Sequence, residues 1–285
     1  MTAIPRIRFA ATGGAPAIEV PAVGQGTWRM GERANRRKQE ADALVLGVDL
    51  GMTVIDTAEM YGQGGAEEVV ADAIAGRRDG VFIVSKVLPG NASREGTIRA
   101  CEASLKRLRT DRIDLYLLHW PGEHPFEDTL AAFRRLVETG KIVRYGVSNF
   151  DQDDMESAFG LTGGDLIASN QVLYNPMRRG IERNLLPWCR ERRVVVMAYS
   201  PVEQGELAGD PALARIASRR GTRPSQIAIA WSFRGGGILT VPKSTDPVHV
   251  RENAAAGAIE LTGDELAEID KAFPRPARAI PLETA

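Results

Sequence analysis

Four titratable side chains stand at or just beyond the ends of short apolar stretches. Asp56, Lys86 and His119 each end or follow a separate run of β-branched and other apolar residues, and Tyr61 comes five positions after Asp56. Such runs are typical of buried strands, where a charge needs a partner. A carboxylate, a phenol, an ammonium group and an imidazole that meet at one place could deliver a proton to a reacting carbonyl group.

Each of these residue types has its own role in such a site. A carbonyl that receives hydride becomes an alkoxide, which the phenol of Tyr61 could protonate although an unperturbed tyrosine has a pKa of about 10. We expect Lys86 to lower the pKa of Tyr61, and Asp56 to keep Lys86 charged. A neutral His119 could donate a hydrogen bond to the carbonyl oxygen. Taken singly, Asp56 could be a helix cap, and His119 an ordinary core histidine.

Composition excludes several other classes of function. The 285 residues are 44% apolar and 26% charged, which is typical of a soluble globular protein. A net charge of −1 provides no broad field for nucleic acid or a membrane surface. The start of the chain lacks the features of a signal peptide, and no run is apolar enough to span a membrane, so we expect a cytoplasmic protein. Cys101 and Cys189 are expected to be free buried thiols, and no metal site is expected.

The elements that must position these residues follow a regular alternation. A hairpin is predicted at residues 6–20, closed by Gly13 and Gly14. Strands are then predicted at residues 23–28, 53–57, 81–87, 113–119, 143–148, 167–173, 194–199 and 238–242. Helices are predicted at residues 34–49, 66–77, 95–109, 128–139, 151–159, 181–192, 225–234, 247–256 and 263–273.

Eight strand–helix units in roughly 250 residues, with no linker between them, favour a closed parallel barrel. We therefore predict an α/β fold, a (β/α)8 TIM barrel with an N-terminal hairpin and extra C-terminal helices. Residues 1–285 would form one domain that ends in a tail at 274–285. Because such barrels carry their chemistry at the carboxyl ends of the strands, Asp56, Lys86 and His119 are expected to meet there.

Several short motifs resemble those of the aldo-keto reductase family, in the family's order, from about residue 6 to 274. They are Asp56-Thr-Ala-x-x-Tyr61-Gly, Ser85-Lys86, Leu118-His119-Trp120-Pro121, Gly146-Val-Ser148-Asn149-Phe, Asn170-Gln171, Tyr199-Ser200-Pro201 and Pro242-Lys243-Ser244. The chain looks most like short bacterial members that reduce aldehydes and small dicarbonyls such as methylglyoxal. The resemblance implies NADPH-dependent reduction, with Asp56, Tyr61, Lys86 and His119 as the catalytic tetrad and Tyr61 as general acid.

The resemblance also implies which residues bind the cofactor. Tyr199 would stack on the nicotinamide, while Ser148, Asn149 and Gln171 would hold its carboxamide. Ser200, Val202 and Gln204 would follow the pyrophosphate, and Lys243, Ser244, Glu252 and Asn253 would hold the adenosine end. The other cofactor contacts expected are Gly26, Thr27, Asp56, Pro201, Pro242 and His249.

One of these positions departs from the family. His249 stands where members usually have an arginine that can bind the 2′-phosphate of NADPH. Because an ordinary imidazole is mostly neutral above pH 7, Lys243 would provide most of the phosphate recognition. We therefore expect a modest preference for NADPH over NADH that weakens between about pH 6 and 8.

The sequence also leads to expectations about the substrate pocket and about alternative functions. The residues expected at the substrate are Trp28, Met60, Tyr61, His119, Trp120, Asn149 and Phe150. The short loop at 121–125 and the short tail predict an open pocket for small aldehydes and α-dicarbonyls. We also expect a monomer rather than an oligomer. Two alternatives are a lyase with Lys86 as a Schiff-base nucleophile, and a nucleotide-binding regulatory subunit with slow turnover.

Overall fold

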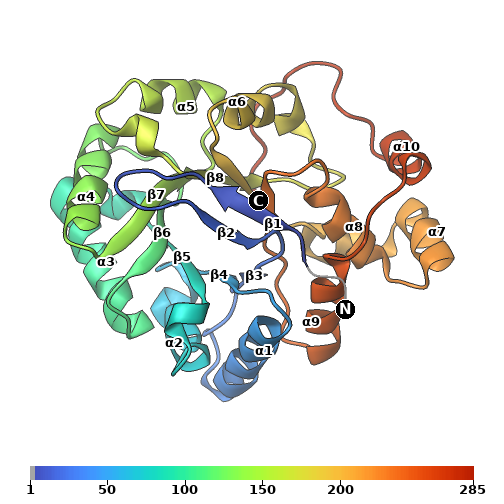
Figure 1. Ribbon diagram of the computed structural model, residues 1–285, viewed down its shortest axis with the longest axis horizontal. Coiled ribbons are helices and arrows are strands. Elements are labelled where there is room, and N and C mark those ends of the chain that lie inside the picture. The colour runs from blue at the N-terminus through green and yellow to red at the C-terminus, as the bar shows by residue number, and fades with distance from the viewer. Residues whose placement is uncertain (1–3) are drawn as a thin grey trace.

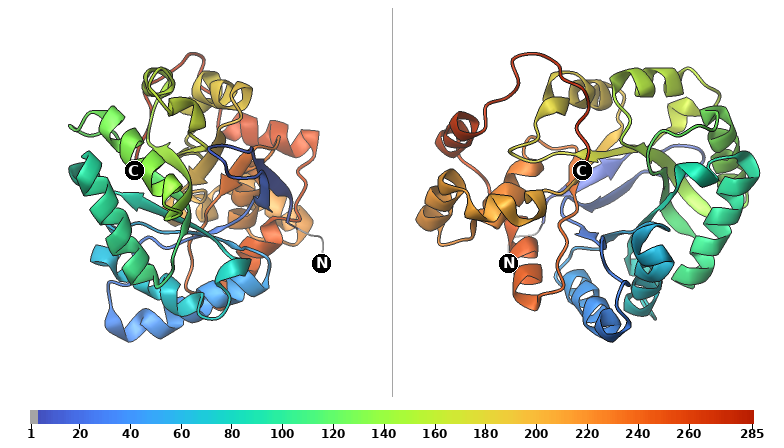
Figure 2. Two further views of the ribbon diagram at one scale, coloured as in Figure 1. Left: turned by 60° about the vertical axis from the view of Figure 1, so that its left-hand side comes forward. Right: turned by 180° about the vertical axis from the view of Figure 1, so that it is seen from behind.

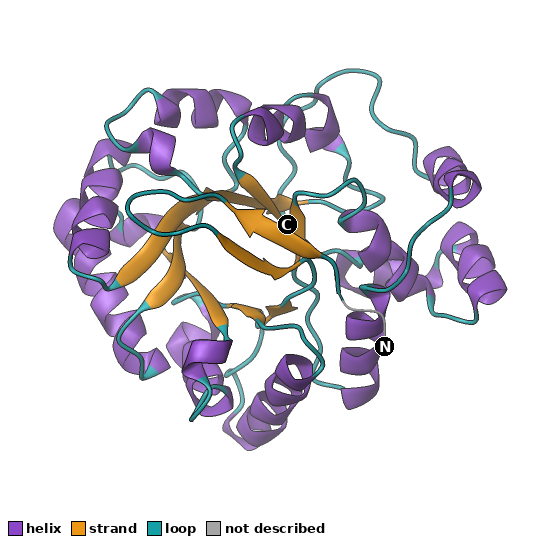
Figure 3. Cartoon of the chain, in the orientation of Figure 1, coloured by secondary structure: helices purple, strands orange, loops and turns teal. Residues whose placement is uncertain are grey.

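Eight parallel strands form a barrel that is surrounded by helices (Figure 1, Figure 3). The computed structural model describes residues 4–285. The barrel strands are β3 (Gln25–Gly26), β4 (Val54–Asp56), β5 (Phe82–Val87), β6 (Ile113–Leu118), β7 (Ile142–Ser148), β8 (Ser169–Leu173), β9 (Val195–Tyr199) and β10 (Ile238–Thr240). Gly24 N–H donates to Thr240 O at 2.8 Å, and Thr240 N–H donates to Ala22 O at 2.8 Å. The last strand thus pairs with the segment that leads into the first, which confirms the predicted (β/α)8 barrel.

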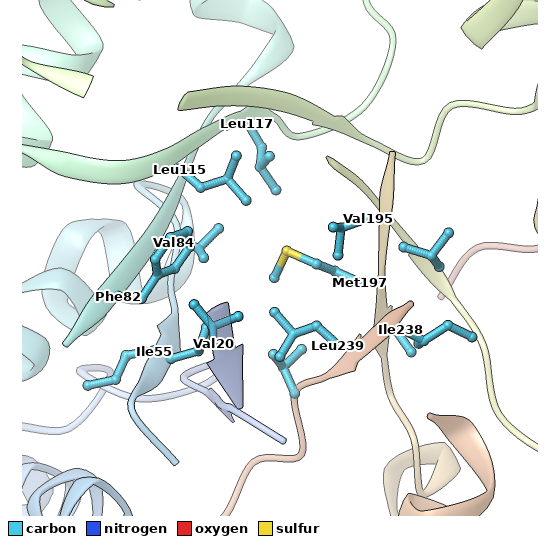
Figure 4. Packing of buried hydrophobic residues seen from close by; sticks show 14 of the residues in the cluster. Val20, Ile55, Phe82, Val84, Leu115, Leu117, Val195, Met197, Ile238 and Leu239 are labelled. Atoms are coloured by element: carbon cyan, nitrogen blue, oxygen red, sulfur yellow. The ribbon is translucent and has the colours of Figure 1, made fainter. Parts of the chain in front are cut away.

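The barrel interior is filled by aliphatic side chains rather than left open. Figure 4 shows Val84, Leu115, Leu117, Met197 and Leu239 gathered in the space between the strands. All five are fully buried. Because helices cover the outer faces, these strands are apolar on both sides, which is why the sequence shows them as continuous apolar runs.

The helices lie outside the strands. They are α1 (Arg37–Asp49), α2 (Gly65–Ala73), α3 (Arg94–Leu108), α4 (Phe126–Glu138), α5 (Gln152–Phe159), α6 (Leu185–Glu191), α7 (Pro211–Arg220), α8 (Pro224–Ser232), α9 (Pro247–Ala256) and α10 (Gly263–Ala272). The helix predicted at residues 181–192 is instead a 3-10 turn, η6 (Gly180–Arg183), followed by α6. Every other predicted helix is present, with ends that shift by a few residues.

One helix was not predicted. The sequence before α7 carries a start signal: the side chain of Asp210 accepts hydrogen bonds from the N–H groups of Ala212 and Leu213, and Pro211 takes the first helical position. Gly221 ends the helix in a left-handed conformation with φ of 63°. The prediction placed one helix after each strand. Because α7 is a second helix between β9 and β10, it did not fit that pattern and was not predicted.

The two additional helices α7 and α10 lie side by side at the outer edge of the molecule (Figure 1). Arg215 Nε is 2.9 Å from Glu268 Oε1, and Arg220 Nε is 2.6 Å from Glu265 Oε1. These ion pairs join the two helices away from the barrel axis. The extra helices therefore leave the carboxyl ends of most strands uncovered.

The N-terminal hairpin covers the amino ends of the barrel strands. Its strands are β1 (Arg6–Phe9) and β2 (Ile18–Pro21). Phe9 stacks on Phe82, the first residue of β5, with ring centroids 5.3 Å apart. The side chain of Ile18, in contrast, is 38% exposed on the outer face of the hairpin.

The C-terminal segment crosses the opposite face of the barrel (Figure 2, right). Arg183 Nε donates to Pro276 O at 2.5 Å, and Arg178 pairs with Glu283 at 3.1 Å. The N–H group of Ala285 then donates to Tyr199 Oη at 3.3 Å. Although only thirteen residues follow the last helix, they reach the carboxyl end of β9.

Several further predictions concern individual residues. Cys101 and Cys189 are buried free thiols, as predicted. Trp188 and Trp231 lie in the core and are 5% and 0% exposed. Within residues 4–285, no helix has both the length and the apolar character needed to cross a membrane.

Replacing Phe9 with alanine is expected to destabilise the barrel. The ring is fully buried between the hairpin and β5, so the free energy of unfolding should fall by about 3–5 kcal/mol. The measurement is denaturation by urea followed by circular dichroism. Ile18→Ala in the same hairpin is the matched control and should change stability by less than about 1 kcal/mol. Equal effects of both substitutions would contradict the packing role of Phe9.

Candidate active site

The ammonium group of Lys86 lies at the centre of the predicted site. Lys86 is fully buried in β5, and its Nζ is 2.9 and 3.0 Å from the two carboxylate oxygens of Asp56. The same Nζ is 2.9 Å from Thr57 O and 3.4 Å from Tyr61 Oη. Three of the four residues predicted from the sequence thus meet within hydrogen-bonding distance.

The strand register explains this meeting. Asp56 is paired with Val84 across β4 and β5, and Lys86 lies two residues beyond Val84. Because side chains alternate along a strand, Lys86 points to the same side as Val84, into the barrel. Gln171 of β8 donates from Nε2 to Asp56 Oδ1 at 2.8 Å, and Thr27 Oγ1 donates to Asp56 O at 3.0 Å. The carboxylate of Asp56 is therefore held by Lys86 and Gln171, while Thr27 binds its backbone carbonyl.

A tight loop positions Tyr61. The residue begins the 3-10 turn η2 (Tyr61–Gly64), in which Gly62 and Gly64 have φ of 56° and 91°. A Cβ atom at Gly64 would lie 2.5 Å from Cδ of Arg107, so the close contact with this arginine requires glycine. Arg107 in turn pairs with the buried Glu67 at 2.6 Å, at the start of α2. This packing holds the loop in a conformation in which the side chain of Tyr61 points towards Lys86.

The pKa of Tyr61 differs from the expectation. Burial raises the pKa of the phenol more than the neighbouring Lys86 lowers it, and the charge of Asp56 raises it further. The predicted net decrease is therefore wrong for the free protein, and Tyr61 keeps its proton at neutral pH. Burial opposes the charge of Lys86, but Asp56 and Tyr61 outweigh it and raise the pKa of the ammonium group.

His119 joins the other three from the end of β6. Its ring meets that of Tyr61 edge to face, with centroids 5.7 Å apart. Burial, and then the positive charge of Lys86, lower the pKa of His119 to about 3. Its Nδ1 is buried and has no hydrogen-bond partner among the described residues. The imidazole is therefore neutral, as predicted, and one ring nitrogen can donate a hydrogen bond.

A second cluster adjoins the tetrad. Tyr199 Oη donates to Asn149 Oδ1 at 3.0 Å, and Asn149 Nδ2 donates to Ser148 Oγ at 3.2 Å. Ser148 Oγ donates to the backbone carbonyl of Gln171 at 2.9 Å. The four residues that the resemblance assigns to the nicotinamide thus form one chain of hydrogen bonds across β7, β8 and β9. The bond from Gln171 to Asp56 joins this cluster to the tetrad.

The loop after β9 has an unusual backbone. Ser200 and Gln204 have φ of 51° and 53°, in the left-handed region that side chains rarely adopt. Such strained conformations are concentrated at ligand-binding loops. Val202 is partly exposed and Gln204 exposed, whereas Pro201 is buried. The loop can therefore offer its backbone and some of its side chains to a ligand.

The residues expected around the adenosine end lie in and after the loop that follows β10. Lys243 and His249 are exposed, and Ser244 Oγ accepts a hydrogen bond from Asp246 N–H at 3.1 Å. Glu252 Oε1 lies 3.4 Å from Arg223 Nε, while Asn253 is 9% exposed. Elsewhere in this set, Thr27 is fully buried, and Gly26 N–H and Pro242 O are hydrogen-bonded to each other at 3.0 Å.

The substrate-wall residues divide into two groups. Trp28, Met60 and Trp120 are 40%, 40% and 37% exposed in the loops that follow β3, β4 and β6, where they can meet a ligand. Phe150 is only 4% exposed and packs on Phe126, with centroids 5.2 Å apart. Phe150 therefore packs against a neighbouring ring, and its contact with a substrate stays a prediction.

Sequence reasoning missed two exposed residues in the loops after the strands. Met177 is 36% exposed in the loop after β8, and Arg29 places its guanidinium 4.3 Å from the centre of the Trp28 ring. Neither belongs to a motif or to a periodic segment. The one available signal was position, since both lie shortly after a predicted strand.

The Asp56–Lys86 pair is expected to show strong coupling in a double-mutant cycle. Asp56→Asn and Lys86→Met each leave a buried group without its partner and should each lower the free energy of unfolding by about 3–5 kcal/mol. The double variant should lose much less than the sum. Denaturation by urea measures all four proteins. The exposed pair Lys38–Asp42 is the control, with coupling below about 1 kcal/mol, and additive losses at Asp56 and Lys86 would contradict the buried ion pair.

Comparison with known proteins agrees with this geometry. The model of the aldo/keto reductase family matches residues 22–273. The chain is 50% identical over 264 residues to methylglyoxal reductase YeaE of Escherichia coli, which covers 91% of this chain and 93% of that protein. A Klebsiella pneumoniae aldo/keto reductase in complex with NADP and acetate is 48% identical, with a TM-score of 0.93 over 96% of this chain and 98% of that one. Another structure from K. pneumoniae, in complex with NADPH, is 46% identical, with a TM-score of 0.94 over 99% and 100% of the two chains. The chain therefore belongs to the aldo-keto reductase family of oxidoreductases.

Proposed function

We propose that the protein uses NADPH to reduce the carbonyl group of small aldehydes and of α-dicarbonyls such as methylglyoxal. The observation that carries this proposal is the contact of a protonated phenol, Tyr61, with the buried ammonium group of Lys86. The relatives support the substrate and the cofactor, because one is a methylglyoxal reductase and two structures hold NADP or NADPH. A single domain, a monomeric state and a cytoplasmic location stay predictions from the sequence.

The donor set fits a nicotinamide dinucleotide. Tyr199, Asn149 and Ser148 form a linked polar surface beside the tetrad, and the left-handed backbone at Ser200 marks a ligand loop. We assign the nicotinamide to these residues and the phosphate groups to the loop after β9 and to Lys243. When bound, the cofactor supplies hydride to the carbonyl carbon.

The tetrad provides the proton. As negative charge develops on the carbonyl oxygen, Tyr61 Oη transfers its proton to that oxygen, so that the C=O group becomes CH–OH. The phenolate that remains is stabilised by Lys86 Nζ, 3.4 Å away. Asp56 keeps Lys86 charged and in place. His119, neutral and next to Tyr61, donates a hydrogen bond to the same oxygen and orients the substrate.

The surroundings of the tetrad favour small substrates. Trp28 and Trp120 offer apolar surface at the rim, while the C-terminal segment approaches Tyr199. The loop from 121 to 125 is short and adds little cover. A compact aldehyde can thus reach Tyr61 past apolar surface, whereas a bulky ligand would meet the C-terminal segment.

The structure bears differently on the two alternative functions, a Schiff-base lyase and a regulatory subunit. A Schiff-base lyase requires a neutral, accessible amine, whereas Lys86 is fully buried, charged and bonded to Asp56 and Thr57. The geometry therefore argues against a lyase. A slow nucleotide-binding subunit would keep the same residues, so only turnover distinguishes it from an enzyme.

Tyr61→Phe is expected to abolish reduction without loss of cofactor binding. Removal of the acid should lower kcat by a factor of about 10²–10⁴, as measured by the fall in NADPH absorbance with methylglyoxal or a nitrobenzaldehyde. Tyr145→Phe is the matched control, because its hydroxyl bonds Gly163 O and its ring packs on Phe133 outside the barrel. Normal turnover in Tyr61→Phe would exclude Tyr61 as the acid. Absence of turnover in the native protein, with NADPH bound, would favour the regulatory subunit.

The pH dependence of kcat/KM follows from the two pKa shifts. With a pKa of about 3, His119 stays neutral throughout the range from about pH 5 upwards. Tyr61 is active when protonated, and because its pKa is raised above the ordinary 10, the rate should decline only at strongly alkaline pH. We therefore expect a flat profile between about pH 5 and 9. A break near pH 6.5 would show that His119 titrates, and one near pH 8 would show a lowered pKa of Tyr61.

A further inference from the structure

Three cations lie close together beside the barrel, at the junction of its first and last strands. Arg29 follows β3, Arg36 is the last residue of the 3-10 turn η1 (Ala34–Arg36) that leads into α1, and Lys243 follows β10. Two hydrogen bonds hold the segments that carry them next to each other. Gly26 N–H donates to Pro242 O at 3.0 Å, and Gln39 Nε2 donates to Thr245 O at 3.3 Å.

These cations are unpaired, unlike the two that directly follow Arg36. Within residues 4–285, neither Arg29, Arg36 nor Lys243 has a carboxylate oxygen within 4.0 Å. By contrast, Arg37 binds Glu68 and Asp72, and Lys38 binds Asp42 at 2.6 Å. Arg29 has instead an aromatic partner, the ring of Trp28. Within the described residues, this group of positive charges therefore has no ion pair of its own.

The charges are close enough to act on one another. Partial desolvation lowers the pKa of Lys243 although the residue is exposed at the surface, and the positive charges of Arg29 and Arg36 lower it further. Glu40 and Glu32 raise it, but the Glu40 carboxylate is largely buried and already accepts the Gly31 N–H at 2.9 Å. The charges of Arg29 and Arg36 thus reach Lys243. A bound phosphate dianion would attract all three cations.

We propose that Arg36, together with Lys243, binds the 2′-phosphate of NADPH, the role that family members usually give to an arginine at the position of His249. The proposal rests on the proposed function, since it concerns the cofactor of the same site. A guanidinium group can form two parallel hydrogen bonds to phosphate oxygens, which a histidine cannot. Arg29 adds positive charge at the rim without being the specific contact.

This assignment changes the expectation for the pH dependence of cofactor choice. A guanidinium group stays charged at every pH at which the protein is folded, whereas an imidazole does not. The preference for NADPH over NADH should therefore be stable from about pH 6 to 8, in contrast to the preference expected if His249 supplied the charge.

The test compares the two cofactors, which differ only in the 2′-phosphate. Arg36→Gln in the full-length protein should raise the Kd for NADPH by roughly 5–20-fold and leave the Kd for NADH within about twofold. Binding is measured by isothermal titration calorimetry without a carbonyl substrate, at pH 6 and pH 8. Lys38→Gln, which removes the same charge from α1 but breaks only an exposed pair with Asp42, is the matched control and should leave both constants unchanged.

Three outcomes would overturn the proposal. They are an unchanged Kd for NADPH in Arg36→Gln, an equal loss for both cofactors, and a native preference that falls steeply between pH 6 and pH 8. The first outcome excludes a contact between Arg36 and the 2′-phosphate. The second places Arg36 at a part of the cofactor that NADPH and NADH share. The third shows that His249 distinguishes NADPH from NADH. Failure of the proposed function is a separate result, namely native protein that binds neither cofactor or reduces no carbonyl compound.

Discussion

The site depends on an ammonium group buried inside the barrel wall. Lys86 has no contact with solvent, so its charge is stable only because Asp56 offers both carboxylate oxygens and Thr57 adds a carbonyl. This charge then determines the state of its neighbours: it contributes to the neutrality of His119 and opposes the effect of burial on Tyr61. The barrel can hold such a charge because adjacent strands bring its partner within bonding distance.

The balance between burial and charge determines the protonation state of Tyr61, the acid in the proposed reaction. Burial alone would make Tyr61 a poor proton donor, and the ammonium group alone would deprotonate it too easily. In the free protein burial dominates, so the proton is present before the reaction begins. In the proposed reaction, proton transfer to the carbonyl oxygen would leave a phenolate on Tyr61, and Lys86 at 3.4 Å would stabilise it.

The sequence predicts the tetrad well because its position depends on the strand ends. Asp56, Lys86 and His119 each end or follow an apolar run, and a parallel barrel brings such ends together. The net pKa shift of Tyr61 could not be predicted, since the extent of burial depends on packing by distant segments. Helix α7 was not predicted because we expected one helix after each strand. Its start signal, the helix cap at Asp210, was present in the sequence. The unpaired state of Arg36 is equally invisible in a sequence, because it depends on which carboxylates the fold brings near.

The two ends of the barrel are covered by opposite ends of the chain. The hairpin with Phe9 lies under the amino ends of the strands, and the segment that ends at Ala285 lies at the catalytic face (Figure 2). This arrangement determines at which end of the chain a fused segment would lie away from the pocket. A purification tag or surface linker joined after Ala285 would begin beside Tyr199, in the approach to the pocket, whereas one joined ahead of the hairpin would begin on the face away from it.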